Sequence, residues 1–126
     1  MLLEKQRSKL ISFMLKAQEM GLVPLTFGNF SLRDKDTGYV CITPSGMEYQ
    51  ALKPEDIVVV DVNGKVIEGK RKYSIETPMH CLIYRKRADV FGVCHTHSSF
   101  CYRLGCNRFT IAGSCSGISC TCGGEY

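Results

Sequence analysis

The sequence predicts an α/β fold in which helices flank an antiparallel sheet. Three observations indicate this fold class: apolar residues at helical spacing near the N-terminus, short β-branched runs separated by turn signals in the middle, and a second helical stretch at residues 78–87. The chain has 126 residues, 44% of them hydrophobic and 22% charged, so it forms at most one domain of ordinary globular composition.

The first predicted element is an amphipathic helix over residues 2–20. Leu10, Phe13, Met14 and Ala17 recur at the spacing that places side chains on one helix face, and we interpret this stripe as core. Gly21 is placed to end the helix in a left-handed turn.

Strands are predicted next, over residues 26–33, 39–43, 57–61 and 65–68. A turn at residues 36–38 joins the first two strands, and Asn63-Gly64 predicts a type I′ hairpin between the last two.

Polar signals lie beside these strands. Gly28 allows the backbone to approach a ligand closely, and Asn29 offers an amide donor, although a turn entering a strand has the same pattern. Ser45-Gly46 follows Pro44 and has a hydroxyl and a backbone N–H that can hold a phosphate oxygen; the alternative is a plain turn.

The second helix is preceded by a carboxylate. Ser74 or Thr77 can cap this helix, and Pro78 fits its first turn because the missing N–H costs little there. Glu76 then lies at the helix start, where it can converge with other groups on a small anionic substrate.

The last predicted strand, within residues 90–99, ends in two histidines. Side chains alternate along a strand, so His95 and His97 share one face, and this geometry suits chelation of one metal ion. The alternative is that one histidine is an ordinary surface residue.

Charge and cysteine usage narrow the function classes. The net charge is +4, but the basic residues are dispersed apart from the triplets at 70–72 and 85–87, which we interpret as solvated faces; nucleic acid is not an expected partner. No apolar run is long enough to cross a membrane, and residues 4–7 are charged or polar where a signal peptide would be apolar, so a cytoplasmic location is expected.

The cysteines are unevenly distributed, because six of the eight follow residue 93. The disulfide framework of a secreted protein would spread them through the fold.

The order of these motifs resembles the class II aldolase/adducin family. The resemblance covers residues 2–100, and the motifs that carry it are Gly28-Asn29-x-Ser31-x-Arg33, Ile42-Thr43-Pro44-Ser45-Gly46, Asp56-Ile57-Val58, Ser74-x-Glu76-x-Pro78-x-His80 and His95-Thr96-His97-Ser98. It implies a three-layer α/β/α sandwich around a mostly antiparallel sheet, and commonly a homotetramer.

The resemblance also implies roles for single residues. Glu76 matches the catalytic acid/base, and His95 and His97 match two zinc ligands. Five further residues match the positions that bind the phosphate of a phosphorylated sugar: Gly28, Asn29, Ser45, Gly46 and Ser74. The chemistry implied is zinc-dependent cleavage of a ketose 1-phosphate into dihydroxyacetone phosphate and an aldehyde, in which zinc acts as a Lewis acid and Glu76 moves a proton.

Other functions stay open. A glutamate at position 76 favours the aldolases over the sugar-phosphate epimerases of the family, which tend to carry aspartate there. A non-catalytic interaction domain like the adducin head is a second alternative. The presence of Glu76, His95 and His97 argues against it. A metal- or redox-binding module on the late cysteines is a third, and Cys120-x-Cys122 lacks the spacing of known modules.

The sequence departs from the family in two ways besides its tail. Ile75 stands where the family's phosphate loop has a second serine, which removes one hydroxyl donor. The third zinc histidine of the family, from its C-terminal part, is missing, and His80 matches a position that is no ligand. Two imidazoles make a poor zinc site, so the metal centre is expected to be incomplete and the chain inactive, unless a cysteine or a neighbouring subunit supplies a ligand.

The tail after Phe100 is also unlike the family, which continues with an alanine-rich segment. The chain instead reads Cys101-Tyr102-Arg103-Leu104-Gly105-Cys106-Asn107. The codons TGC TAC CGC CTT GGC TGC AAC encode those residues and, read one base later, give Ala-Thr-Ala-Leu-Ala-Ala. We therefore expect residues 1–100 to be the aldolase-like portion and residues 101–126 to be a divergent, poorly ordered, frame-shifted tail. The alternative is a genuine cysteine-rich tail.

Overall fold

The computed structural model describes residues 1–23 and 28–96 of the chain. The elements in these ranges are, in order, α1 (Glu4–Glu19), β1 (Asn29–Arg33), β2 (Val40–Ile42), the 3-10 helices η1 (Tyr49–Ala51) and η2 (Pro54–Asp56), β3 (Val58–Val60), β4 (Val66–Glu68), α2 (Thr77–Lys86) and β5 (Gly92–His95). The expected tail at residues 101–126 lies outside the described residues.

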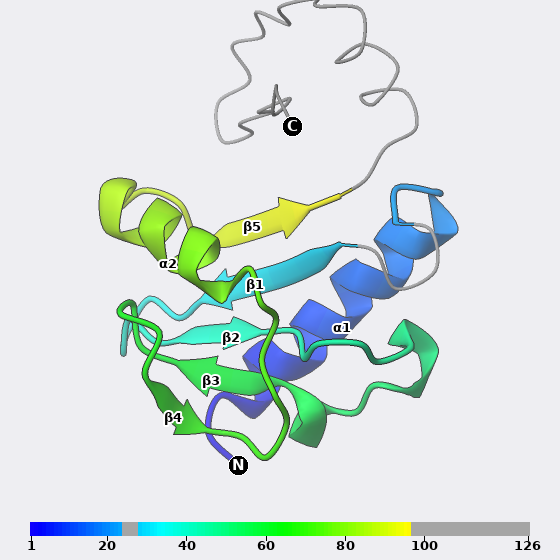
Figure 1. The fold of residues 1–126 in the computed structure, drawn as a ribbon, viewed down its shortest axis with the longest axis horizontal. Coiled ribbons are helices and arrows are strands. Elements are labelled where there is room, and N and C mark those ends of the chain that lie inside the picture. Colours follow the sequence, from blue (N-terminus) through cyan, green and yellow to red (C-terminus); the bar gives the residue numbers. More distant parts are fainter. Residues whose placement is uncertain (24–27, 97–126) are drawn as a thin grey trace, which may run out of the picture.

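The strands form one sheet in the order β4-β3-β2-β1-β5, and each neighbouring pair among them is antiparallel (Figure 1). Asn29 at the start of β1 pairs with His95 at the end of β5, and Ser31 pairs with Ile42 at the end of β2. The start of β1 therefore lies between the ends of β2 and β5, at one end of the sheet.

The two helices cover opposite faces of this sheet (Figure 1). The apolar side of α1 packs on one face, in a cluster that contains Leu10, Met14, Phe30, Cys41 and Val59. The neighbouring strand residues point the other way and meet α2, in a cluster that contains Val40, Ile42, Val58, Val60, Cys81 and Tyr84. The predicted three-layer α/β/α sandwich around an antiparallel sheet is confirmed.

The first helix ends as its sequence predicts. Gly21 has φ +71°, its N–H donates to the carbonyl of Gln18, and the N–H of Leu22 donates to the carbonyl of Ala17. A left-handed residue followed by this longer bond is the usual glycine-containing end of a helix.

The hairpin between β3 and β4 is present, but its predicted turn type is wrong. Gly64 has φ +85°, whereas Asn63 does not have a positive φ, and a type I′ turn requires one at both central residues. The N–H of Gly64 donates to the carbonyl of Asp61, and the Asp61 carboxylate accepts from the N–H groups of Asn63 and Lys65. The side chain of Asp61 therefore stabilises a longer loop than the Asn-Gly pair predicts.

The predicted caps of the second helix are also corrected. The residue that precedes α2 is Glu76, whose carbonyl accepts from the N–H groups of Met79 and His80. Ser74 lies one step further out, and its hydroxyl accepts the N–H of Glu76. Ser74 thus fixes the entry into α2 rather than capping it, and this entry sets the position of Glu76.

A buried arginine, Arg7, stabilises the start of α1 through hydrogen bonds and an ion pair. Arg7 is 1% exposed, its Nε donates to the carbonyl of Leu2, and its Nη1 donates to the carbonyls of Pro54 and Ile57. Its Nη2 forms an ion pair with Glu68 at 2.5 Å. One side chain therefore joins α1, η2 and β4.

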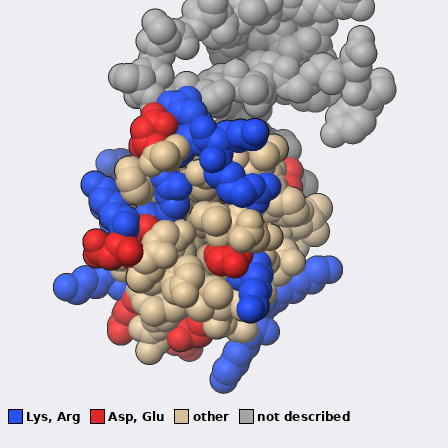
Figure 2. Space-filling model, turned by 90° about the vertical axis from the view of Figure 1, so that its left-hand side faces the viewer, with Lys and Arg blue, Asp and Glu red and all other residues tan. Residues whose placement is uncertain are grey.

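The surface agrees with the interpretation of the basic triplets as solvated. Residues 70–72 and 85–87 are all exposed. Figure 2, which views the molecule from the left-hand side of Figure 1, shows Lys and Arg side chains gathered towards the top, interrupted by acidic and uncharged groups. Within the described residues, the helices are too short or too polar to cross a membrane.

Candidate active site

The candidate site lies where the start of β1 meets the ends of β2 and β5. The pairing of Asn29 with His95 places these residues side by side on neighbouring strands. The chain after β2 pairs with the chain before α2 through a bridge between Pro44 and Tyr73, which brings the entry into α2 to the same end of the sheet. Segments from four parts of the sequence therefore gather around Glu76.

Glu76 is held by two side chains at this point. Its Oε2 accepts a hydrogen bond from the Asn29 carboxamide nitrogen and lies 2.5 Å from Nδ1 of His95. The side chains of Glu76 and His95 are 35% and 26% exposed, so the pair is accessible from solvent without being surrounded by it. Such a carboxylate can exchange protons with a small molecule bound beside it.

Asn29 connects Glu76 to buried polar groups behind it. Its Oδ1 lies 2.5 Å from Nε2 of His80, and Nδ1 of His80 lies 2.7 Å from Oγ of Ser31. The same Oγ lies 2.7 Å from the hydroxyl of Tyr84. Ser31, His80 and Tyr84 are at most 2% exposed.

Chemistry fixes the direction of these bonds. The Glu76 carboxylate accepts, so Asn29 turns its NH2 group towards it and its Oδ1 towards His80. An amide oxygen only accepts, so Nε2 of His80 carries the proton and Nδ1 accepts from Ser31. The continuous chain is then Tyr84 to Ser31 to His80 to Asn29 to Glu76, each donating to the next.

Burial and hydrogen bonding set the protonation states. Partial burial acts to raise the pKa of Glu76, but the hydrogen bonds from Asn29 and His95 outweigh it, and the pKa is lowered. Burial lowers the pKa of His80 to about 4, with a further contribution from His95. At neutral pH, Glu76 is therefore a carboxylate and His80 is a neutral imidazole.

Gly28 has a structural reason to be glycine. Its φ is +112°, and a Cβ at this position would lie 2.6 Å from the carbonyl oxygen of His95 and 2.8 Å from Cγ1 of Val23. The close backbone approach expected at Gly28 is thus an approach to β5. Because Gly28 has no side chain, β1 and β5 can approach each other closely at the site.

The expected phosphate loops are neighbours. The N–H of Ser45 donates to the carbonyl of Lys72, and the N–H of Ser74 donates to the carbonyl of Thr43. The N–H of Ser45 is therefore engaged within the protein, and the phosphate-binding role expected of this loop stays a prediction. Ser45 and Gly46 are exposed, whereas Ser74 is buried. Ile75, at the family's serine position, is 76% exposed.

The metal site is tested only in part. His97 lies outside the described residues, and within the ranges 1–23 and 28–96 no three His, Cys, Asp or Glu side chains gather closely enough to hold a metal ion. The donors that meet are one imidazole and one carboxylate, which are types that zinc accepts. A carboxylate that receives a ring N–H is also the usual support of a ligating histidine, whose other nitrogen meets the metal. The donor chemistry thus fits zinc, and these residues alone do not complete its coordination.

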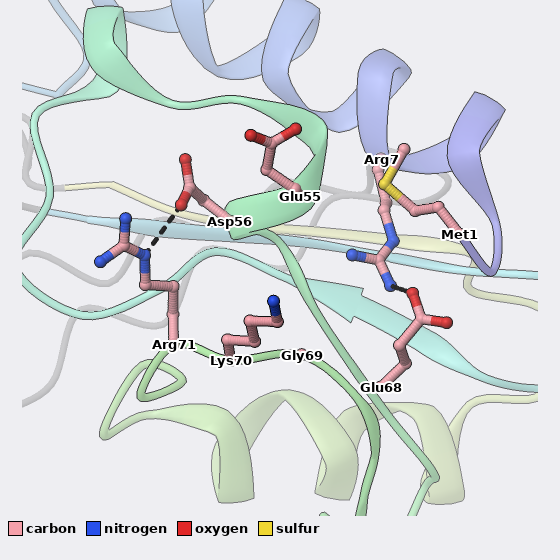
Figure 3. A pocket seen from close by; sticks show the side chains of 8 residues that line it. All are labelled: Met1, Arg7, Glu55, Asp56, Glu68, Gly69, Lys70 and Arg71. Atoms are coloured by element: carbon pink, nitrogen blue, oxygen red, sulfur yellow. Dashed lines mark hydrogen bonds and ion pairs between the residues drawn. The ribbon is translucent and has the colours of Figure 1, made fainter.

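A cavity of about 630 Å³ lies elsewhere, between the start of α1, η2 and the chain after β4 (Figure 3). Its charged side chains are largely paired: Arg7 contacts Glu68, and Arg71 contacts Asp56. Burial acts to raise the pKa of Asp56, but the hydrogen bonds from Arg71 and Lys53 outweigh it, and the pKa is lowered. Glu76, Asn29 and His95 do not line this cavity, so we do not assign the reaction to it.

Sequence reasoning missed the buried part of the site. Ser31 and His80 carried the resemblance without receiving a role, and Tyr84 was not singled out. A signal was present, because Glu76, His80 and Tyr84 follow one another at intervals of four residues and so lie on one face of α2.

Comparison with known proteins places this fold in a known family. The chain belongs to the family described as the class II aldolase and adducin N-terminal domain, whose model matches residues 8–120. The matched range runs past residue 100, and the domain boundary expected there stays a prediction.

Three relatives illustrate the similarity. The chain is 45% identical over 100 residues to a 5-deoxy-D-ribulose 1-phosphate aldolase of Bacillus thuringiensis, a match covering 79% of this chain and 47% of the relative. It is 38% identical over 97 residues to an L-ribulose-5-phosphate 4-epimerase of Salmonella paratyphi B, covering 77% and 42%. A solved L-fuculose 1-phosphate aldolase superposes with a TM-score of 0.78 at 38% identity, covering 82% and 49%. The chain thus spans about half the length of the relatives it matches.

Proposed function

We propose that this chain carries the proton-transferring part of a lyase that cleaves a ketose 1-phosphate into dihydroxyacetone phosphate and an aldehyde. The observation that supports the proposal most directly is the joint contact of Asn29 and His95 with one oxygen of Glu76. The family membership and the aldolase names of two relatives support the same reaction.

Glu76 has the chemical task of moving a proton. In the cleavage direction a base removes the proton of a substrate hydroxyl, the carbon–carbon bond breaks, and an enediolate forms that is then protonated to dihydroxyacetone phosphate. A partly exposed carboxylate held by hydrogen bonds suits this exchange, since it is fixed in place and still reachable. Asn29 and His95 orient it.

Zinc is proposed as the metal, with His95 and His97 as two of the residues that would hold it. When bound, zinc would supply Lewis-acid stabilisation of the enediolate oxygens. Zinc stoichiometry of the purified chain, beside a His95→Ala, His97→Ala double variant, tests this assignment. Near-stoichiometric zinc that disappears in the variant supports it, whereas equal zinc in both proteins contradicts it.

The substrate phosphate is proposed to bind at Gly28, Asn29, Ser45, Gly46 and Ser74. The hydrogen bonds between the segments before α2 and after β2 keep these two loops adjacent. A phosphate held there would orient the substrate away from the reacting carbons and contribute binding energy. Assembly as a homotetramer and a cytoplasmic location are also proposals.

The test is an assay of dihydroxyacetone phosphate release from 5-deoxyribulose 1-phosphate and fuculose 1-phosphate, with the zinc-supplemented protein. Glu76→Gln should lower kcat by about 10²- to 10⁴-fold, the usual contribution of a general acid–base. Glu19→Gln, at the exposed end of α1, is the matched control and should behave as wild type. Cleavage that is equally fast in wild type and Glu76→Gln would contradict the proposal.

An epimerase is the second candidate, because one relative at 38% identity is named as one. The same assay, run with L-ribulose 5-phosphate and read for its C4 epimer, separates the two reactions. A binding domain without catalysis would bind the phosphorylated sugar, or nothing, and change none of these substrates.

A further inference from the structure

We propose that His80 is a positioning residue of the candidate site, which holds the Asn29 carboxamide in the one orientation that turns its NH2 group towards Glu76. This inference deepens the proposed function and rests on it only where it gives Glu76 a proton to move. Its geometric part concerns two buried side chains and can be measured without any substrate.

The first support is that the Asn29 carboxamide can adopt two orientations, which differ by exchange of its oxygen and its nitrogen. The two ends of a carboxamide have nearly the same shape, so packing alone does not decide which end meets a carboxylate. If Asn29 were reversed, its oxygen would face the Glu76 oxygen, and two acceptors would oppose each other. A donor on the other side of Asn29 is what selects the useful orientation.

His80 supplies this donor. Its Nε2 lies 2.5 Å from Oδ1 of Asn29, and it is completely buried, so water does not replace it. It lies in the first turn of α2, four residues after Glu76, so the start of this helix and the residue before it supply both the carboxylate and the group that orients its partner. Because both side chains are buried, this contact is shielded from competition by solvent.

The second support is that His80 is itself fixed on its other side. Oγ of Ser31 lies 2.7 Å from its Nδ1, and the hydroxyl of Tyr84 lies 2.7 Å from the same Oγ. Tyr84 donates to Ser31, which leaves the Ser31 proton for Nδ1 and the His80 proton for Nε2. The titratable groups near His80 are Glu76 just before α2, Tyr84 on α2 and His95 on β5. Within the described buried side chains, every polar atom has a partner.

The experiment is nitrogen-15 NMR of the full 126-residue protein at neutral pH, with His80→Gln used to assign the His80 signals. We expect Nε2 to resonate as a protonated and Nδ1 as an unprotonated nitrogen. The opposite tautomer, or a doubly protonated ring, would overturn the proposal.

Variants then test the effect on Asn29. His80→Phe removes the donor, and the Asn29 NH2 protons should exchange with solvent at least about tenfold faster, as expected for losing roughly one hydrogen bond. His80→Gln places an amide N–H near the former Nε2 and should restore slow exchange. Tyr84→Phe is the matched control, since it deletes a buried hydroxyl of the same layer but leaves the bond to Asn29, and it should keep slow exchange. Unchanged exchange in His80→Phe would overturn the proposal, and if that variant does not fold, the wild-type tautomer and His80→Gln decide.

A kinetic measurement separates this proposal from the proposed function. With a ketose 1-phosphate that the wild type cleaves, His80→Phe should lower kcat at least about tenfold, the effect of a misplaced catalytic group. His80→Gln should recover most of the rate, and equal kcat in all three proteins would overturn the positioning role. A wild type that cleaves none of the sugars but has the expected tautomer and exchange contradicts the lyase and supports the positioning of Asn29.

Discussion

Nδ1 of His95 lies 2.5 Å from Oε2 of Glu76, so the last residue of β5 contacts the residue that immediately precedes α2. This contact joins a strand end to a helix start on the α2 side of the sheet. It depends on how closely β1 and β5 approach each other, on how the chain enters α2, and on the buried groups behind Asn29.

The approach of β1 to β5 depends on Gly28. Gly28→Ala should lower the free energy of unfolding by at least about 3 kcal/mol, because it combines an unfavourable φ with a Cβ 2.6 Å from the His95 carbonyl oxygen. Gly21→Ala, also at positive φ but with nothing within 4 Å, should cost only about 1 kcal/mol. Urea unfolding of both variants measures the difference, and equal costs would show that β5 does not press on Gly28.

The stability of the protein should depend on pH through His80. Its pKa is about 4 in the folded state against 6.5 for an ordinary histidine. Above pH 6.5 the ring is neutral in both states and has no effect. As the pH falls from 6.5 towards 4, His80 becomes protonated in the unfolded chain but stays neutral in the folded protein. The free energy of unfolding therefore falls by about 3 kcal/mol.

His80→Gln provides the control for this pH dependence. The variant should lack the loss between pH 6.5 and 4.5, while both proteins should lose stability at lower pH as carboxylates with lowered pKa become protonated. Denaturant titrations at a series of pH values give the comparison. Parallel curves for the two proteins above pH 4.5 would contradict the buried, neutral His80.

The start of α1 should depend strongly on Arg7. Arg7→Met leaves the carbonyls of Leu2, Pro54 and Ile57 without their donor, and we expect a loss of about 3 kcal/mol. Glu68→Gln keeps these three bonds and changes a side chain that is 42% exposed, so about 1 kcal/mol or less is expected. A larger loss for Glu68→Gln than for Arg7→Met, measured by urea unfolding, would assign the stabilisation to the ion pair instead.

The fold could be predicted from the sequence wherever one helix or strand carries its own signal. The apolar stripe of α1 and its end at Gly21, and the alternation that sends Cys41 and Val40 to opposite faces, are local patterns with fixed periods. The turn after β3 could not be predicted in detail, because it depends on the Asp61 side chain and on a register shift at Val59 and Val60.

The candidate site was predictable only through resemblance. Asn29, Glu76 and His95 are far apart in the sequence, and no local sequence pattern predicts their contact. The antiparallel pairing of β1 with β5 brings Asn29 and His95 together, and both then contact Glu76. The buried groups behind Asn29 were missed because polar residues on a helix look like surface residues until the helix face is known. His97 lies outside the described residues, so its role as a metal ligand stays a prediction.

The central claim is that Glu76 moves a proton on the carbon that forms or loses the carbon–carbon bond. Its most direct test is proton NMR of dihydroxyacetone phosphate in D2O with the zinc-supplemented 126-residue protein, because no aldehyde has to be identified. We predict that deuterium enters the carbon that bears the free hydroxyl group, and that Glu76→Gln slows this exchange by at least about 100-fold. Exchange no faster than in buffer alone, or equally fast in Glu76→Gln and wild type, would contradict the account.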